Sequence, residues 1–101
     1  MKALALHPEA EAEFETAADF YESRRRGYGE RFRAEVAEAF ARIRSTPTAF
    51  SLHEGGPARR RLLSRFPYGI YYVERDTDVF VLAVMHQHRN PDYWLDRISD
   101  A

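Results

Sequence analysis

Two histidines, an arginine and a tyrosine stand close together near the C-terminus, and these residue types can move protons and stabilise negative charge. They are His86, His88, Arg89 and Tyr93. In ribonuclease chemistry a base takes the proton of the ribose 2′-hydroxyl, an acid protonates the leaving 5′-oxygen, and an arginine stabilises the phosphorane-like transition state. The competing interpretation is structural: His86 caps a strand, with its ring nitrogens bonded to the sheet and to the following loop.

The same histidines have a spacing found among metal ligands. His86 and His88 are two residues apart, so on a strand they would share a face. A third ligand would have to come from His53, His7 or an acid, and none of these stands at a fixed spacing. The chain has no cysteine, which excludes disulfides, thiolate metal sites and a thiol nucleophile. We therefore expect no metal and no cofactor.

A second group of candidate residues lies on an expected strand from Ala58 to Phe66. Alternate residues of a strand share a face, and one face here would collect Leu63 and three arginines: Arg59, Arg61 and Arg65. Leu62 and Phe66 would then serve the core. Together with Arg89, these arginines are suited to binding a partner through carboxylate or phosphate groups. The alternative is a solvated strand face.

The N-terminal half predicts a strand and two helices. Lys2 to Leu6 alternates as a strand does, and Pro8 stands at a favourable first helical position. Apolar residues with helical spacing follow as far as the arginines at 24–26, and Gly27 would supply a left-handed cap. A second helix from Phe32 to Ile43 repeats this spacing, and the short connection makes the pair an antiparallel hairpin.

The C-terminal half predicts two more strands and a short helix. Tyr68–Glu74 and Asp78–His86 are separated by a tight turn and should form an antiparallel hairpin. The apolar run 79–84 indicates a strand that is buried on both faces. Tyr71 and Tyr72 point to opposite faces, so we expect one in the core and the other on the surface.

A short terminal helix should begin at Asn90-Pro91-Asp92 and carry three apolar residues: Tyr93, Trp94 and Ile98. The order is therefore βααβββ(α), which is typical of a single α+β domain over residues 1–101. The N-terminal helical hairpin should pack on one face of a small, mainly antiparallel sheet.

Composition limits the possible functions. The chain has 101 residues, 45% of them apolar and 31% charged, with a net charge of −1. Non-specific binding to nucleic acid draws its energy from surplus cations, which this chain lacks. No apolar run approaches the length of a bilayer span, and the N-terminal stretch is too short for a signal peptide. We therefore expect a cytoplasmic protein that does not associate with a membrane.

Several segments resemble, nearly end to end and in the same order, the RelE/ParE superfamily of type II toxin–antitoxin toxins. They are His7–Phe14, Tyr21-Glu22, Gly29–Phe32, the Pro47 turn, Arg60–Tyr72, Ala83–His86, Arg89, Pro91, Tyr93 and Trp94. The resemblance implies the βααβββ fold and a bacterial toxin that inhibits growth until a cognate antitoxin neutralises it. The antitoxin's C-terminal segment would wrap the toxin across its helices and sheet.

The superfamily divides by target, and the resemblance implies different roles for the same residues. ParE-like members, of the plasmid-stabilisation branch, poison DNA gyrase, and the Phe66-Pro67-Tyr68 and Tyr93-Trp94 signatures are similar to this branch. RelE-like members cleave mRNA on the ribosome without metal, using basic residues and a C-terminal tyrosine that corresponds to Tyr93. Arg61 or Arg65 would occupy the basic position on the sheet.

The ribonuclease set is incomplete in this chain. Gln87 stands where a further basic residue is expected, and the second helix has no lysine. His86 or His88 would have to substitute as the base. We therefore favour a non-enzymatic, ParE-like toxin that binds DNA gyrase over a ribosome-dependent endoribonuclease. A third possibility is a degenerate member that binds its antitoxin but poisons nothing.

Overall fold

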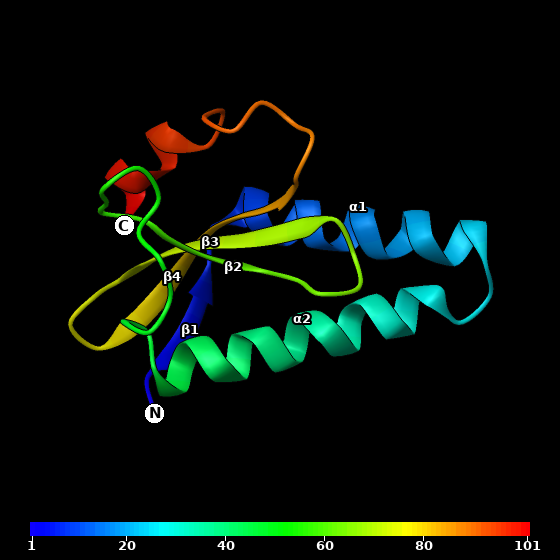
Figure 1. Cartoon of the computed structure of the whole chain (residues 1–101), viewed down its shortest axis with the longest axis horizontal. Coiled ribbons are helices and arrows are strands. Elements are labelled where there is room, and N and C mark those ends of the chain that lie inside the picture. The colour runs from blue at the N-terminus through cyan, green and yellow to red at the C-terminus, as the bar shows by residue number, and fades with distance from the viewer.

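The computed structural model describes residues 1–101 as a helical hairpin packed on a four-stranded sheet, with a C-terminal segment on the far side from α2 (Figure 1). In chain order the elements are β1 (Ala3–Leu6), α1 (Pro8–Arg24), α2 (Tyr28–Ser45), β2 (Arg59–Leu62), β3 (Tyr68–Glu74), β4 (Asp78–His86) and the 3₁₀ helix η1 (Leu95–Asp100). The predicted α+β class and the βααβββ order are confirmed. No helix is long and apolar enough to cross a bilayer.

The first helix begins where the sequence predicts. His7 precedes it, and its Nδ1 accepts a hydrogen bond from the Glu9 backbone N–H at 3.1 Å, which satisfies one of the free amide groups of the first turn. Pro8 occupies the first helical turn, where its missing N–H costs nothing. The helix ends at Arg24, slightly earlier than the arginine cluster suggested.

The turn between the helices is tied down by one carboxylate. Gly27 has a φ of 90°, as predicted, but it precedes α2 as its N-cap instead of ending α1. Glu22 accepts hydrogen bonds from the backbone N–H groups of Gly27 and Gly29, each at 3.1 Å. At Gly29 the helices approach so closely that a Cβ would lie 2.9 Å from the Ala18 carbonyl oxygen. Only glycine fits at this crossing without a shift of the backbone.

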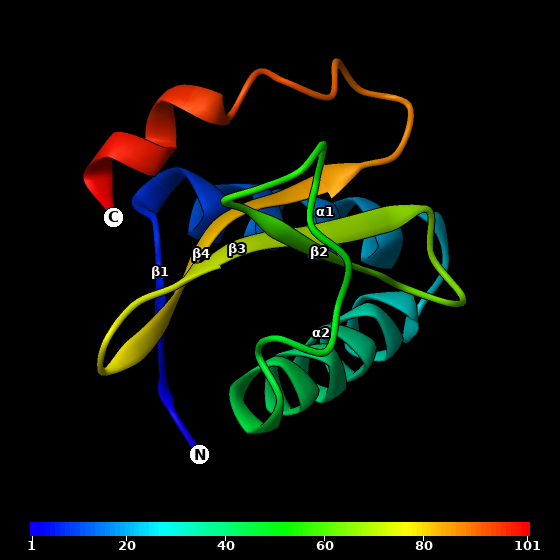
Figure 2. The same cartoon turned by 60° about the vertical axis from the view of Figure 1, so that its left-hand side comes forward.

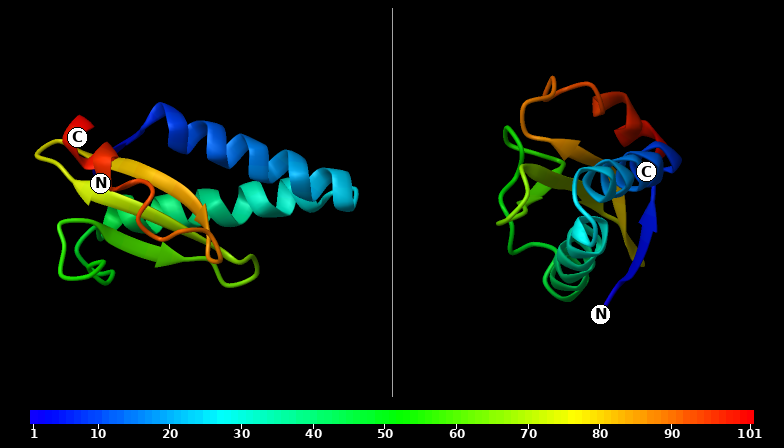
Figure 3. Two further views of the ribbon diagram at one scale, coloured as in Figure 1. Left: turned by 90° about the horizontal axis from the view of Figure 1, so that it is seen from above. Right: turned by 90° about the vertical axis from the view of Figure 1, so that its right-hand side faces the viewer.

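The sheet has the order β1-β4-β3-β2. β1 is parallel to β4, and the other pairs are antiparallel, so the sheet is mainly antiparallel as predicted. The stretch 79–85 of β4 is completely buried, which confirms that this strand is covered on both faces. Both helices lie on one side of the sheet (Figure 3).

The two faces of the sheet belong to separate cores. Ile70 and Tyr72 pack with Phe32 in the core under the helices. Tyr71 packs with Trp94 in the core on the opposite face, and both are buried. The expectation that one of the two tyrosines would be exposed is therefore wrong, because the C-terminal segment and the loop before β2 cover the second face.

The edge strand β2 differs from the prediction. It ends at Leu62, and Leu62 is 43% exposed whereas Leu63 is buried at 7%. The core position assigned to Leu62 is therefore wrong. The reason is that the two faces of the strand are turned the other way: Arg60 and Leu62 are exposed, whereas Leu63 follows the partly buried face of Arg59 and Arg61 into the core under the helices. Regular pairing stops after Leu62, and the Leu63 backbone N–H donates to the Tyr68 carbonyl at 2.9 Å, which closes the loop between β2 and β3.

The C-terminal segment crosses the side of the sheet away from α2 and returns to the start of α1 (Figure 2). The expected helix is present only as the 3₁₀ helix from Leu95 to Asp100. Asn90 does not cap it: its side-chain oxygen accepts the Asp92 backbone N–H at 3.0 Å and makes a local turn instead. Tyr93 and Trp94 therefore precede the helix.

Candidate functional site

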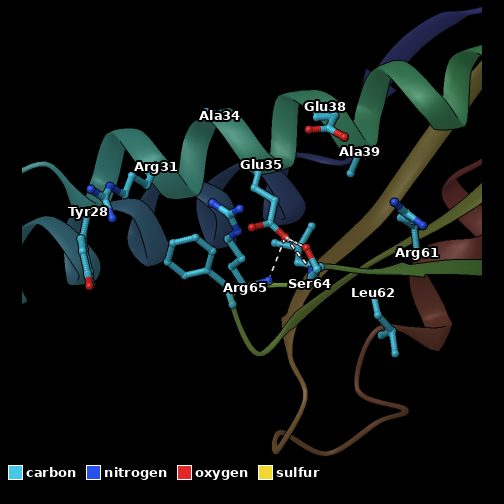
Figure 4. Close-up of a pocket in the computed structure, with 12 residues that line it drawn as sticks. Tyr28, Arg31, Ala34, Glu35, Glu38, Ala39, Arg61, Leu62, Ser64 and Arg65 are labelled. Carbon is cyan, nitrogen blue, oxygen red and sulfur yellow. Dashed lines mark hydrogen bonds between the residues drawn. The ribbon is translucent and has the colours of Figure 1, made fainter.

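A groove of about 630 Å³ runs between α2 and the loop that joins β2 to β3 (Figure 4). Its polar lining is mixed in charge and comes from both sides: Arg31, Glu35 and Glu38 from α2, and Arg61, Ser64 and Arg65 from β2 and the loop. The exposed side chain of Leu62 lies at its border. The groove therefore offers both apolar contact and charged groups to a partner.

One carboxylate fixes the shape of this groove. Glu35 Oε2 accepts hydrogen bonds from the backbone N–H of Ser64 at 2.6 Å and of Arg65 at 3.1 Å (Figure 4). The Ser64 hydroxyl donates to the same oxygen at 3.2 Å. Because the loop's amides are held by α2, the Arg65 side chain starts from a fixed backbone position.

The arginines that the sequence groups on one strand face have different surroundings in the structure. Arg59 donates from Nη1 to the Phe50 carbonyl oxygen at 2.7 Å, so it holds the loop after α2. Arg61 lies over the Phe50 ring, 5.0 Å from its centroid, and lines the groove. Arg65 lines the same groove and is exposed. Arg61 and Arg65 are thus brought together, whereas Arg59 has an internal partner.

Arg89 lines a different hollow, of about 320 Å³, between α1 and the end of β4. The other charged or titratable side chains around this hollow are Glu9, Glu13, Tyr68, His86 and Arg97. The guanidinium carbon of Arg89 lies 3.9 Å from the centroid of the Tyr93 ring, which is a close cation–π contact. Arg89 is therefore not part of the groove that holds Arg61 and Arg65.

Tyr93 points its hydroxyl group into the protein. The hydroxyl donates to Glu13 Oε2 at 2.6 Å. Burial, the hydrogen bond to Glu13 and the charge of that carboxylate all raise the pKa of Tyr93 above its ordinary value. A phenol in this state holds its proton and directs it to an acceptor within the protein.

Glu13 is the central charged residue of this hollow, although the sequence did not identify it as a candidate site residue. Its Oε1 accepts the backbone N–H of Val84 at 3.1 Å, and both oxygens bind the Arg97 guanidinium, at 3.2 and 3.0 Å. The sequence did contain a signal. Glu13 is three residues after Ala10 and four before Ala17, so it shares their buried helical face.

The two histidines of the C-terminal motif lie together without sharing a strand. β4 ends at His86, and a turn follows, so the strand-face argument does not apply to His88. The His86 Nδ1 accepts the His88 backbone N–H at 3.1 Å, and the two ring centroids are 5.3 Å apart. One nitrogen of His86 is thus used to hold the turn, as the structural interpretation expected.

The helical hairpin on one face of a mixed four-stranded sheet is an α+β domain of ParE-like fold. One chain of a solved structure, "Chromosomal ParDE TA system from P. aeruginosa", is similar in fold, with a TM-score of 0.72 and 15% identity over 85% of this chain and 96% of that chain. Residues 4–91 match the model of the family described as ParE toxin of the type II toxin–antitoxin system parDE. The chain belongs to this ParE toxin family. No curated protein sequence matches the chain.

Proposed function

We propose that this chain is the toxin of a parDE-type module, that an antitoxin holds it inactive, and that the free toxin arrests growth by binding DNA gyrase. The family match over residues 4–91 supports the toxin role. The observation that favours binding over catalysis is the position of Tyr93, whose hydroxyl group donates inward to Glu13 at 2.6 Å.

The groove along α2 is the surface that we assign to a protein partner. It is open, it carries the exposed Leu62, and its Arg61 and Arg65 have no carboxylate partner within the chain. An antitoxin segment that combines apolar and acidic side chains would complement these groups, because Arg binds carboxylates through two parallel hydrogen bonds. The second partner site in the proposal is Arg89, at the other hollow.

The experiment that tests the target uses purified chain and purified gyrase. We expect the chain to inhibit supercoiling of relaxed plasmid, and we expect the neighbouring antitoxin to relieve the inhibition. Arg61→Ala with Arg65→Ala should weaken antitoxin binding by about 10-fold to 100-fold if the groove is an anchoring site. Arg26→Ala is the matched control, since Arg26 is exposed and lies outside the groove.

The competing activity is mRNA cleavage, and Tyr93→Phe separates the two. A gyrase-binding toxin should keep its growth arrest in Tyr93→Phe, because the phenol ring and its contact with Arg89 remain. Expression of the wild-type chain should leave mRNA intact in primer extension. Ribosome-dependent cleavage that disappears in Tyr93→Phe, with supercoiling unaffected, would overturn the proposal in favour of the endoribonuclease.

A third outcome identifies a non-toxic member of the family. Normal growth of cells that express soluble chain without antitoxin, together with retained antitoxin binding, would mean that only the partner-binding role is left. The assay must therefore include a pull-down of the antitoxin from the same cells.

A further inference from the structure

We propose that His53, Glu54 and Asp92 form a binding site for a divalent transition-metal ion, with Zn²⁺ as the best fit. This site is separate from the groove along α2 and from the hollow that contains His86, and it is not part of the proposed toxin function. It lies where the loop before β2 meets the loop between β4 and η1.

The main observation behind this proposal is a buried histidine nitrogen without a hydrogen-bond partner. The His53 side chain is nine-tenths buried, and its Nε2 makes no hydrogen bond within the protein. Buried polar atoms almost always have a partner, so an exception calls for a specific explanation. The nitrogen is aimed at two carboxylates whose oxygens lie near it but not in hydrogen-bonding alignment.

The distances fit metal coordination. His53 Nε2 lies 3.3 Å from Glu54 Oε2 and 3.5 Å from Asp92 Oδ1. In a tetrahedral zinc site with bonds of about 2.1 Å, two ligand atoms lie about 3.4 Å apart. All three ligand atoms lie within 4.8 Å of one another. The Glu54 side chain is 72% exposed and free to close the remaining gap between the two carboxylates.

The ligand types indicate which metal the site would bind. One imidazole nitrogen and two carboxylate oxygens are a donor set that suits zinc, whereas Ca²⁺ and Mg²⁺ prefer oxygen ligands alone. Three protein ligands leave the fourth tetrahedral position open to water or to a partner's side chain. The sequence-based expectation of no metal considered His86 and His88 as the core of a site; neither belongs to this group.

Two hydrogen bonds fix the backbone of His53. The His53 backbone N–H donates to the Ala58 carbonyl at 2.7 Å, and its own carbonyl accepts the Gly56 N–H at 2.9 Å. The ring lies edge-on to Tyr71 and tilted against Trp94, at centroid distances of 5.5 and 5.3 Å. A metal ion would therefore link two loops that both cover the second core of the sheet.

The test is a titration of the full, untagged chain with ZnCl₂ by isothermal calorimetry, together with Tm measurements with zinc and with EDTA. We expect one zinc per chain and a Tm that rises with the zinc concentration, because zinc binds only the folded arrangement of ligands. Glu54→Gln combined with Asp92→Asn should weaken binding about 100-fold or more. Both side chains are largely exposed, at 72% and 48%, so this variant should fold normally.

Two controls keep the result specific. His53→Gln should also lose the zinc, whereas His88→Ala, which removes an exposed histidine elsewhere, should keep it. Absence of stoichiometric binding to the wild-type chain would overturn the proposal. So would binding that survives the Glu54→Gln, Asp92→Asn variant but is lost in His88→Ala. None of these readouts depends on gyrase or growth, so the proposed function is tested independently.

Discussion

Glu13 and Arg97, 84 positions apart in the sequence, form a two-pronged ion pair that fastens the C-terminal segment to α1. Arg97 is buried at 7% exposure, and its Nη1 also donates to the Leu82 carbonyl at 2.9 Å. Burial opposes the charge of the guanidinium, but the hydrogen bond and charge of Glu13 outweigh it and raise the pKa of Arg97. Both side chains of the pair are therefore engaged in charged hydrogen bonds within the protein.

Glu13→Gln should lower the free energy of unfolding by about 3 kcal/mol, because it leaves the buried Arg97 charge with only the exposed carboxylate of Glu9, 3.9 Å away. Urea unfolding at neutral pH measures the change. Glu11→Gln is the control: Glu11 is in the same helix, is exposed, and should change stability by less than about 0.5 kcal/mol.

The double variant Glu13→Gln, Arg97→Met isolates the pair. It should be more stable than the sum of the two single changes suggests, since it removes both charges together. Additive effects of the two single substitutions would show that the ion pair contributes nothing of its own.

The protein should become less stable at alkaline pH because the buried phenol of Tyr72 then loses its proton. Burial raises the pKa of Tyr72 to about 12, and its hydroxyl donates to the Pro47 carbonyl at 2.6 Å. The unfolded chain releases this proton near pH 10, so the folded state holds it more tightly. The stabilisation is complete below pH 10 and is lost as the pH rises from 10 to 12.

The loss associated with Tyr72 should be on the order of 2 kcal/mol, measured by urea unfolding across this pH range. Tyr72→Phe should remove from the absorbance titration one phenol that titrates at unusually high pH, and it should reduce the pH dependence of stability between pH 10 and 12. An unchanged alkaline titration in Tyr72→Phe would contradict the assignment.

Gly29→Ala should destabilise the protein even though Gly29 lies in a helix. In an exposed helix the change would gain about 1 kcal/mol, but here the new Cβ would lie 2.9 Å from the Ala18 carbonyl oxygen. We expect a net loss of about 1–3 kcal/mol, since the backbone must shift. Ala34→Gly, at an exposed position of the same helix, is the control and should lose only about 1 kcal/mol. A stabilised Gly29→Ala would show that the hairpin can open slightly at no cost.

The sequence was a good guide wherever a local pattern decides the structure. Helical spacing predicted both helices, Pro8 marked the start of the first, and the apolar run 79–84 predicted the buried strand. These features depend on residues within a few positions of one another. The sequence also predicted the left-handed Gly27, because few other residues adopt a positive φ at low cost.

The assignment of residues to faces of the edge strand was less reliable. Alternation predicts which residues of β2 share a face, but it does not say which of the two faces meets the core. Leu63 is therefore buried in place of Leu62, and Arg65, which follows the strand, is positioned by a loop. Arg59 and Arg61 looked equivalent in the sequence, but they contact different groups of Phe50. Arg59 binds its backbone carbonyl, whereas Arg61 lies over its ring.

The sequence by itself determined the order of elements and the apolar faces of the two helices, because these follow from short-range periodicity, and it indicated the family through the resemblance of its motifs. Only the tertiary structure decided what the residues of the C-terminal motif do. Tyr93 and Arg97, near the C-terminus, form hydrogen bonds with Glu13 in α1, and the carboxylate of Asp92 lies close to His53 of another loop. The partner that satisfies each charge lies many residues away, and no local pattern encodes it.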